Sequence, residues 1–318
     1  MSYSDFKGEK NMAAKANITG TAQFATITAR EVDFVTRFTR NWDALTKVLG
    51  IMRPIRKQAG TRLVSYEAEM DGTLAGGTVA EGDEIPFTKF AVKEVSYGDI
   101  DISKYAKSVT VEAVQKYGAD IAVEKTDEQF LVELQSKVLG DFYTFLKTGT
   151  LKGTQTTWQK ALAIAKGAVL DKFASINRTV TDVVGFANIM DLYTYLGTAD
   201  ITVQTAFGLQ YVENFLGYST LFLLPEKYIP AGTVIAIPVE NIDLYYIDPA
   251  DSDFAKMGLQ YTVEGETNLI GFHVEGDYSR ATGDCYALMG MKLWAEYLDG
   301  IAVVTIGDSD TAPAVVNG

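Results

Sequence analysis

The stretch EAEMDGTLAGGTVAEGDEIPF, residues 67–87, is unusual for the interior of a globular protein. It contains no Lys or Arg, and four glycines interrupt it. Both flanking segments nevertheless alternate apolar and polar residues as β-strands do. Such a stretch has little to bury against its own chain, which raises the question of what surface stabilises it. Its six carboxylates are Glu67, Glu69, Asp71, Glu81, Asp83 and Glu84.

The two flanking segments predict a long hairpin. From Val64 to Met70 every second residue is apolar, and Phe90 and Val92 share one side of the return arm. A change of phase at Lys93–Glu94 predicts a β-bulge there. Arms of about ten residues at ~3.3 Å each place the tip ~30 Å from the base, too far to pack on its own domain. We expect Met70, Leu74 and Val79 to join the six carboxylates in an interface.

Composition and charge narrow the class of protein. The chain has 318 residues, of which 47% are apolar, so it can form a large core. Its net charge of −13 argues against wrapping nucleic acid by neutralising phosphates. The single cysteine, Cys285, cannot form an internal disulfide, which suits a reducing cytoplasm. The sequence shows neither a signal peptide nor an apolar run long enough to span a membrane, so no membrane partner is predicted.

The N-terminal part predicts a polar arm followed by an amphipathic helix. Residues 1–27 show no sustained period, and Thr28 with Glu31 makes a capping box. The helix is expected to end at Gly50. A basic cluster follows without a nearby acid in the sequence, and it is either a solvated turn or a docking patch. The helix stripe is Phe34, Phe38, Trp42, Leu45 and Leu49, and the cluster is Arg53, Arg56, Lys57 and Arg62.

The middle of the chain alternates helices and strands. Thr126 with Gln129 predicts the start of a long helix ending near residues 148–149, and Thr156 with Gln159 predicts the start of another. The strand TDVVGFA leads into a helix capped by Asn188, which ends at Gly197. The alternation over 156–250 predicts a compact α/β subdomain, and long antiparallel strands are expected beyond it.

The sequence offers little for catalysis. His273 has no Ser, Cys or carboxylate at motif spacing, so it is interpreted as structural, and Cys285 lacks a nucleophile signature. No glycine pattern matches a nucleotide-binding loop. The acids Asp248, Asp251 and Asp253 do not have EF-hand spacing, and a polar turn is favoured over a metal-assisted hydrolase. We predict no enzyme activity, no catalytic residue, no metal and no cofactor, and interpret the chain as built to contact copies of itself.

The order of these parts resembles the major capsid protein of tailed bacteriophages, whose Hong Kong 97-type fold is shared with encapsulin shells. The resemblance covers roughly residues 30–307 and lies in three segments, with SKYAKSVTVEAV following the first. The segments are EGDEIPFTKFAVKEVSYGDIDIS, VEKTDEQFLVELQSKVLGDFYTFLKTG and DVVGFANIMDLYTYLG.

The resemblance implies an α+β, Hong Kong 97-like fold with an N-arm, an extended E-loop hairpin, a P-domain with a long spine helix and an α/β A-domain. By its order of parts, the N-arm is residues 1–50, the E-loop 51–97, the P-domain 98–155 with 256–318, and the A-domain 156–255. It implies hexamers and pentamers of this chain in an icosahedral shell around double-stranded DNA, in a virion assembled in the host bacterial cytoplasm. The E-loop then finds its burial on a neighbouring subunit, and we expect its acids to meet the basic cluster there.

Two departures from the family refine these expectations. Some members crosslink subunits through an E-loop lysine, but no Lys lies between Arg62 and Lys89, so we expect a dissociated monomer band on a denaturing gel. The helical scaffolding segment that often precedes the arm is missing, so either it has been removed or a separate scaffolding protein replaces it, and Met1 favours the second. A portal, a motor and possible decoration proteins are implied by the resemblance only. The alternatives are an encapsulin-like cargo shell and a phage tube or adhesion protein.

Overall fold

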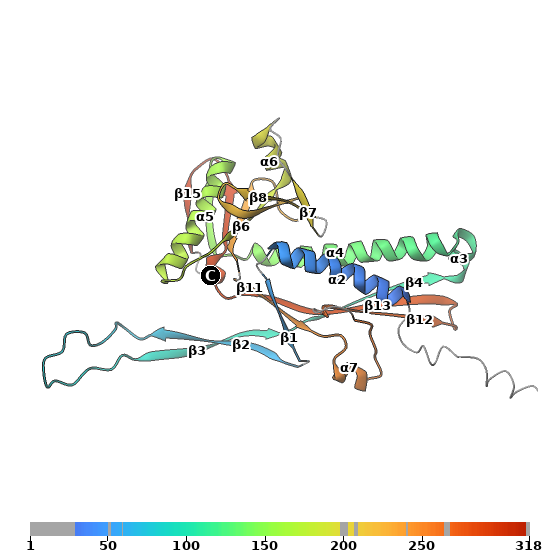
Figure 1. The fold of residues 1–318 in the computed structure, drawn as a ribbon, viewed down its shortest axis with the longest axis horizontal. Helices are drawn as coiled ribbons and strands as arrows, with labels where there is room; N and C mark the ends of the chain where they lie inside the picture. The colour runs from blue at the N-terminus through green and yellow to red at the C-terminus, as the bar shows by residue number, and fades with distance from the viewer. Residues whose placement is uncertain are drawn as a thin grey trace, which may run out of the picture.

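The structure, a computed structural model, shows an elongated α+β chain from which one hairpin projects at the end of the body (Figure 1). It describes residues 29–49, 52–58, 60–197, 203–206, 209–239, 241–263 and 268–315. The predicted arm at residues 1–27 and the capping residue Thr28 lie outside this part of the chain. Within the described residues, no helix combines the length and the apolar character that a membrane crossing requires.

The projecting hairpin, here called the finger, comprises β2, β3 and the connection between them, residues 62–99. β2 is Arg62–Met70 and β3 is Phe90–Asp99, so the predicted hairpin is confirmed. The bulge lies elsewhere than expected. Leu63 faces Gly98 and Val64 faces Ser96, which leaves one extra residue on β3 at the root of the finger. Lys93 and Glu94, where the sequence predicted the bulge, pair in regular register with Glu67 and Tyr66.

A five-stranded sheet forms the base of the body. Its long central strand β13 is antiparallel to β4 on one side and to β12 and then β11 on the other, and β1 adds a parallel edge beyond β11. This sheet unites segments from the start, middle and end of the sequence. Its strands are β1 (Met52–Lys57), β4 (Ile102–Thr110), β11 (Ile242–Ile247), β12 (Ile270–Asp277) and β13 (Thr282–Ala295).

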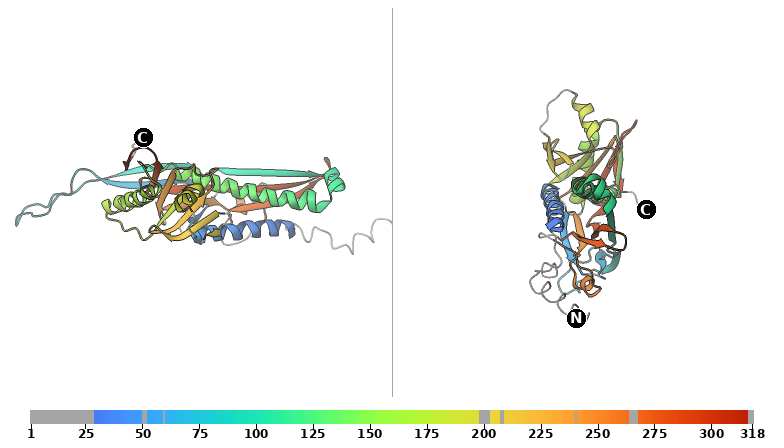
Figure 2. Two further views of the ribbon diagram at one scale, coloured as in Figure 1. Left: turned by 90° about the horizontal axis from the view of Figure 1, so that it is seen from above. Right: turned by 90° about the vertical axis from the view of Figure 1, so that its right-hand side faces the viewer.

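Helices α2 (Ala29–Leu49) and α4 (Lys125–Leu146) run along this sheet (Figures 1 and 2). The long predicted helix is confirmed, but Thr126 does not cap it. A short α3 (Val111–Tyr117) and a π-helical turn (Asp120–Glu124) lead directly into α4. The Thr126 hydroxyl therefore donates to the carbonyl of Ala122, 2.8 Å away, inside a continuing helix.

An eight-stranded sheet forms the second layer and is buried on both faces. One face joins α2, α4 and the five-stranded sheet in a common core, and α5 (Trp158–Ser175) packs on the other. The capping residue of α5 is Thr157, one residue after the expected Thr156. The strands are β5 (Leu151–Gln155), β6 (Val183–Asn188), β7 (Gln204–Ala206), β8 (Leu209–Phe215), β9 (Tyr218–Leu224), β10 (Thr233–Pro238), β14 (Ala302–Ile306) and β15 (Thr311–Val315).

Two smaller helices and a 3-10 turn complete the described elements. The sequence prediction for α6 (Ile189–Leu196) is confirmed at both ends. The Asn188 side chain accepts from the amide of Met190 at 2.8 Å, and Gly197 follows the last turn. α7 (Ser252–Lys256) is a single short turn capped by Asp251, and the 3-10 turn Leu298–Gly300 precedes β14.

The sheets do not follow the predicted domain boundaries. β1, expected in the E-loop range 51–97, pairs with β11, which was expected in the A-domain range 156–255. Conversely β5, β14 and β15, expected in the P-domain, pair with strands of the eight-stranded sheet. The reason is that strand partners are chosen across long sequence separations, which composition and periodicity do not reveal.

Candidate assembly surface

Within the described part of the chain, the finger is the segment that the body covers least. Among residues 64–99, no side chain that the structure describes is buried. The connection at its far end is ordered by a few local contacts. The amide of Asp71 donates to the carbonyl of Lys89 at 2.9 Å, the two side chains form an ion pair at 2.7 Å, and Ala75 donates to the Thr88 hydroxyl at 3.0 Å.

Large apolar side chains are exposed along the whole finger. Phe87 is 93% exposed, and Leu74, Ile85 and Val92 are each about two-thirds exposed or more. Contiguous exposed apolar groups of this size mark contact surfaces in soluble proteins. Val79, which the sequence also assigned to the interface, is half-buried within the connection. The exposed set is Val64, Tyr66, Met70, Leu74, Ile85, Phe87, Phe90 and Val92.

The sequence reasoning emphasised the carboxylates and missed Ile85 and Phe87. The spacing IPF directly after an acidic run was a usable signal, because apolar residues in a Gly-rich connection have no strand face to explain them. Glu81, Asp83 and Glu84 are exposed, and none of the ion pairs among the described residues involves them. Glu67 and Glu69 lie on β2 at every second position.

The basic cluster already has partners within this chain. Arg53 contacts the carboxylate of Asp243 at 2.9 Å, and Arg56 contacts Asp248 at 3.0 Å. These acids come from β11 and the residue after it, so the pairing of β1 with β11 brings them together. The cluster therefore has acidic partners in the structure, although its neighbourhood in the sequence contains none. Lys57 lies 5.0 Å from the ring centre of Tyr245, and Arg62 donates to the Ser96 hydroxyl at 3.2 Å.

The aromatic stripe of α2 is not a surface, which corrects the expected interface at Phe34, Phe38 and Trp42. These side chains are 1%, 0% and 2% exposed. Phe34 stacks on Phe272 of β12, with ring centres 3.9 Å apart, and contributes to the main core. An amphipathic helix buries its apolar stripe on the nearest sheet, and here that sheet belongs to the same chain.

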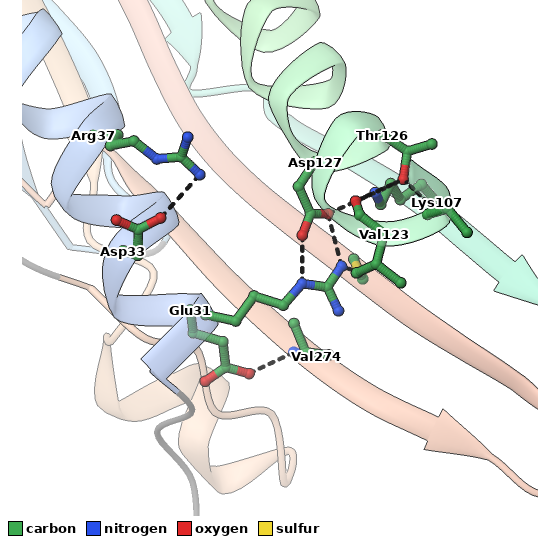
Figure 3. Close-up of polar contacts among 11 residues, drawn as sticks. Glu31, Asp33, Arg37, Lys107, Val123, Thr126, Asp127 and Val274 are labelled. Carbon is green, nitrogen blue, oxygen red and sulfur yellow. Dashed lines mark hydrogen bonds and ion pairs between the residues drawn. The ribbon is translucent and has the colours of Figure 1, made fainter. Parts of the chain in front are cut away.

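Two adjacent charged residues fasten the start of α2 (Figure 3). Arg30 donates to both carboxylate oxygens of Asp127 on α4, and Lys107 of β4 lies 2.6 Å from the same carboxylate. Glu31 turns the other way and accepts from the amide of Val274 on β12 at 2.5 Å and from the hydroxyl of Thr262 at 2.8 Å. The predicted capping residue Glu31 therefore anchors the helix to the sheet.

The electrostatics of this anchor follow from its burial. Burial alone would raise the pKa of Asp127, but the hydrogen bonds from Arg30 and Lys107 outweigh that effect and hold the pKa below its usual value. The nearby Cys285 thiol lies 2.9 Å from Arg30, and its pKa is raised, mainly by burial. A buried thiol with a raised pKa is a poor nucleophile, which agrees with a structural interpretation of Cys285.

The acids considered for metal chemistry have structural partners. Asp248 accepts from the amide of Ala250 at 2.8 Å and from Asn268 at 3.0 Å, besides its ion pair with Arg56. Asp251 caps α7 through the amide of Asp253 at 3.0 Å. No group of three or more His, Cys, Asp or Glu within the described ranges has a metal-binding arrangement.

A hollow of about 550 Å³ lies between β1, the segment before β6 and the end of β13. Within it, Arg178 contacts Glu296 at 3.1 Å and lies 4.9 Å from the ring centre of Tyr297. It offers no Ser, Cys or His beside a base, so its lining shows no arrangement for nucleophilic catalysis.

Comparison with known proteins identifies solved structures of similar fold. No protein-family model matches the sequence, and neither does any curated protein. A chain of the bacteriophage PhiM1 mature capsid aligns with a TM-score of 0.53 at 8% identity, covering 82% of this chain and 87% of that one. A chain of the cyanophage P-SCSP1u capsid gives 0.53 at 9% identity, with 82% and 87% covered.

A chain from Mycobacterium phage Patience gives a TM-score of 0.52 at 10% identity, with 90% of this chain and 92% of that one covered. The likeness thus extends over most of this chain, at sequence identities that show a fold and no more. The chain has the Hong Kong 97-type capsid fold.

Proposed function

We propose that this chain is the major capsid protein of a tailed bacteriophage and assembles with copies of itself into an icosahedral shell around double-stranded DNA. The observation that carries the proposal is the finger, whose exposed apolar side chains are not covered by any of the described residues of their own chain. The capsid-type fold supports it, because the matched phage chains share the arrangement over most of their length. In this role the protein belongs to the virion and is assembled in the host cytoplasm.

The proposed contact is head-to-tail: the finger of one copy lies on the body of the next, and such contacts close into rings and shells when the rotation permits. Burying a side chain such as Phe87 contributes about 1.5–3 kcal/mol, whereas an exposed ion pair contributes about 0–1 kcal/mol. Apolar burial therefore drives finger docking, and the carboxylates of the tip set its orientation and solubility. The expected pairing of the finger carboxylates with the basic cluster of a neighbour is therefore given less weight, since Arg53 and Arg56 already pair with Asp243 and Asp248.

The net charge of −13 also bears on the contents of the shell. An acidic chain gains little from phosphate contacts, so DNA would be driven in by a portal and motor and not drawn in by the wall. A separate scaffolding protein, and decoration proteins where present, complete the proposed set of partners.

The test is assembly of the purified protein and of a finger variant, observed by negative-stain electron microscopy and size-exclusion chromatography. We expect Ile85→Ser with Phe87→Ser to abolish closed particles while the circular dichroism of the subunit is unchanged. Met257→Ser removes an equally exposed apolar group outside the finger and serves as the matched control. Filaments, or discrete rings without closure, would favour a tube or adhesion protein instead. Closed particles from phage-infected cells that contain protein and no DNA would favour a cargo shell.

A further inference from the structure

The finger joins the body at a small cluster of buried apolar side chains. Leu63, the first apolar residue of β2, and Ile100, just after β3, are 4% and 7% exposed. They pack with Ile247 of β11, and Tyr245 and Phe254 lie against this group. This cluster is separate from the two large cores. The burial of the finger thus stops abruptly at its root.

The root also contains the break in strand register. The extra residue on β3 lies beside Gly98, whose φ of +77° is in the region that favours glycine. The ammonium of Lys292, on β13, donates to the carbonyl of Asp99 at 2.9 Å. A Cβ added to Gly98 would lie 3.4 Å from that same ammonium. One lysine therefore holds the backbone directly beside the bulge.

The supporting strand changes partner at the same place. On the side of β13 opposite β4, the pairing with β12 ends at Met289 and the pairing with β11 begins at Gly290, which also faces Ile102 of β4. A Cβ on Gly290 would lie 3.2 Å from Ile247, and its absence permits the close approach of the strands there. The finger is thus rooted where the sheet passes from one partner strand to the next.

We propose that these features form a hinge that sets the direction of the finger, with Lys292 as its positioning residue. The bulge at Gly98 permits rotation of β2 and β3 as one body, and the lysine contact with Asp99 selects one angle. The proposal concerns how the finger of a single subunit is held. Its consequence for shell geometry rests on the proposed function, since the direction of the finger determines where it meets the next copy.

Small rotations at the root have large effects at the far end. Nine paired residues at ~3.3 Å each extend ~30 Å, so a rotation of about 10° moves the end of the paired strands by ~5 Å. A displacement of that size exceeds the tolerance of a packed contact, because dispersion attraction falls off over less than 1 Å. Control of the angle at Lys292 is therefore control of the contact made at Phe87.

The test measures distances between spin labels in dissociated subunits by double electron–electron resonance. Labels are attached at Thr78→Cys in the finger and Thr144→Cys on α4, both exposed positions. Cys285 is fully buried and is left as it is. The variants are Lys292→Met, Lys292→Arg, which retains a cationic donor, Gly98→Ala, and Lys104→Met as a control for loss of an exposed lysine from the same sheet.

We expect a single narrow distance distribution for the unchanged root and for Lys292→Arg and Lys104→Met. Lys292→Met should broaden it by about 5 Å, and Gly98→Ala should shift its centre, because alanine disfavours the left-handed backbone. A distribution for Lys292→Met as narrow as that of the unchanged root would overturn the proposal, as would a broad distribution in the unchanged root. Because dissociated subunits are measured, the result holds whether or not the chain forms shells. Electron microscopy of the same variants reports on shell formation separately.

Discussion

Replacing Asp127 with Asn removes the charge that fastens the start of α2 and leaves the size of the side chain almost unchanged. In the native chain Asp127 is 5% exposed and holds both Arg30 and Lys107. Asparagine accepts one hydrogen bond at the same place but cannot compensate two cations. We therefore expect Asp127→Asn to loosen α2 and to spare the eight-stranded sheet, which is packed independently of this contact.

The magnitude follows from the contacts that are lost. A hydrogen bond to a charged group contributes about 1.5–3 kcal/mol, and Arg30 keeps part of its hydration because its side chain is 30% exposed. A net loss of about 2 kcal/mol corresponds to a roughly 30-fold increase in the opening equilibrium. The sign of the pH dependence follows from the lowered pKa of Asp127. The carboxylate contributes stability at pH values above about 4, and this stability is lost as pH falls through the folded-state pKa.

Amide hydrogen exchange at α2, measured at matched pH for each protein, is the assay. Glu128→Gln is the matched control, since Glu128 is the next residue and its ion pair with Lys125, at 2.7 Å, is exposed. We expect faster exchange over the first turns of α2 in Asp127→Asn alone, and a difference from the native chain that diminishes well below pH 4. Equal exchange in the two variants, or an undiminished difference at low pH, would refute the role given to Asp127.

Two further predictions concern the core. Phe38→Ala removes a fully buried ring from the core shared by α2 and both sheets, and should cost about 3–5 kcal/mol of unfolding free energy in a urea titration. A cost below about 1 kcal/mol would instead indicate that Phe38 lies at the surface, as the sequence analysis expected. Gly271→Ala places a methyl group 2.5 Å from the Cβ of Pro249 and should cost about 1–3 kcal/mol. Gly276→Ala on the same strand meets open space and is the control, so equal midpoints for the two alanine variants would contradict the crowding described at Gly271.

The sequence predicted those parts of the fold that depend on local pattern. The period-two alternation around residues 64–70 and 90–97 gave the finger, and its length follows from the strand rise alone. The long helix predicted from Thr126 to near residues 148–149 is α4, which begins one residue earlier and ends at Leu146. Asn188 and Gly197 gave both ends of α6, because capping depends on neighbours in the sequence.

The wrong predictions concern features that depend on residues distant in the sequence. Thr126 satisfies the pattern of a capping box, but the preceding π-helical turn supplies helical neighbours, so no terminus exists there. Arg53 lacks an acid near it in the sequence and finds Asp243 across a separation of 190 residues. Ile85 and Phe87 were missed because their connection has no period from which to identify a solvent face, so that their place in a Gly-rich stretch was the only signal.

The central position of β13 has a consequence for synthesis on the ribosome. This strand, residues 282–295, pairs with β4, β11 and β12, and β11 in turn pairs with β1. β4 therefore leaves the exit tunnel some 170 residues before β13, the strand that completes its sheet, leaves it. At about 5–20 residues per second, its edge stays uncovered for about 10–35 s. Uncovered edges of nascent strands pair with one another in crowded conditions. Expression at reduced translation rate should therefore depend on chaperones that hold the incomplete chain, and truncation before residue 282 should give insoluble product.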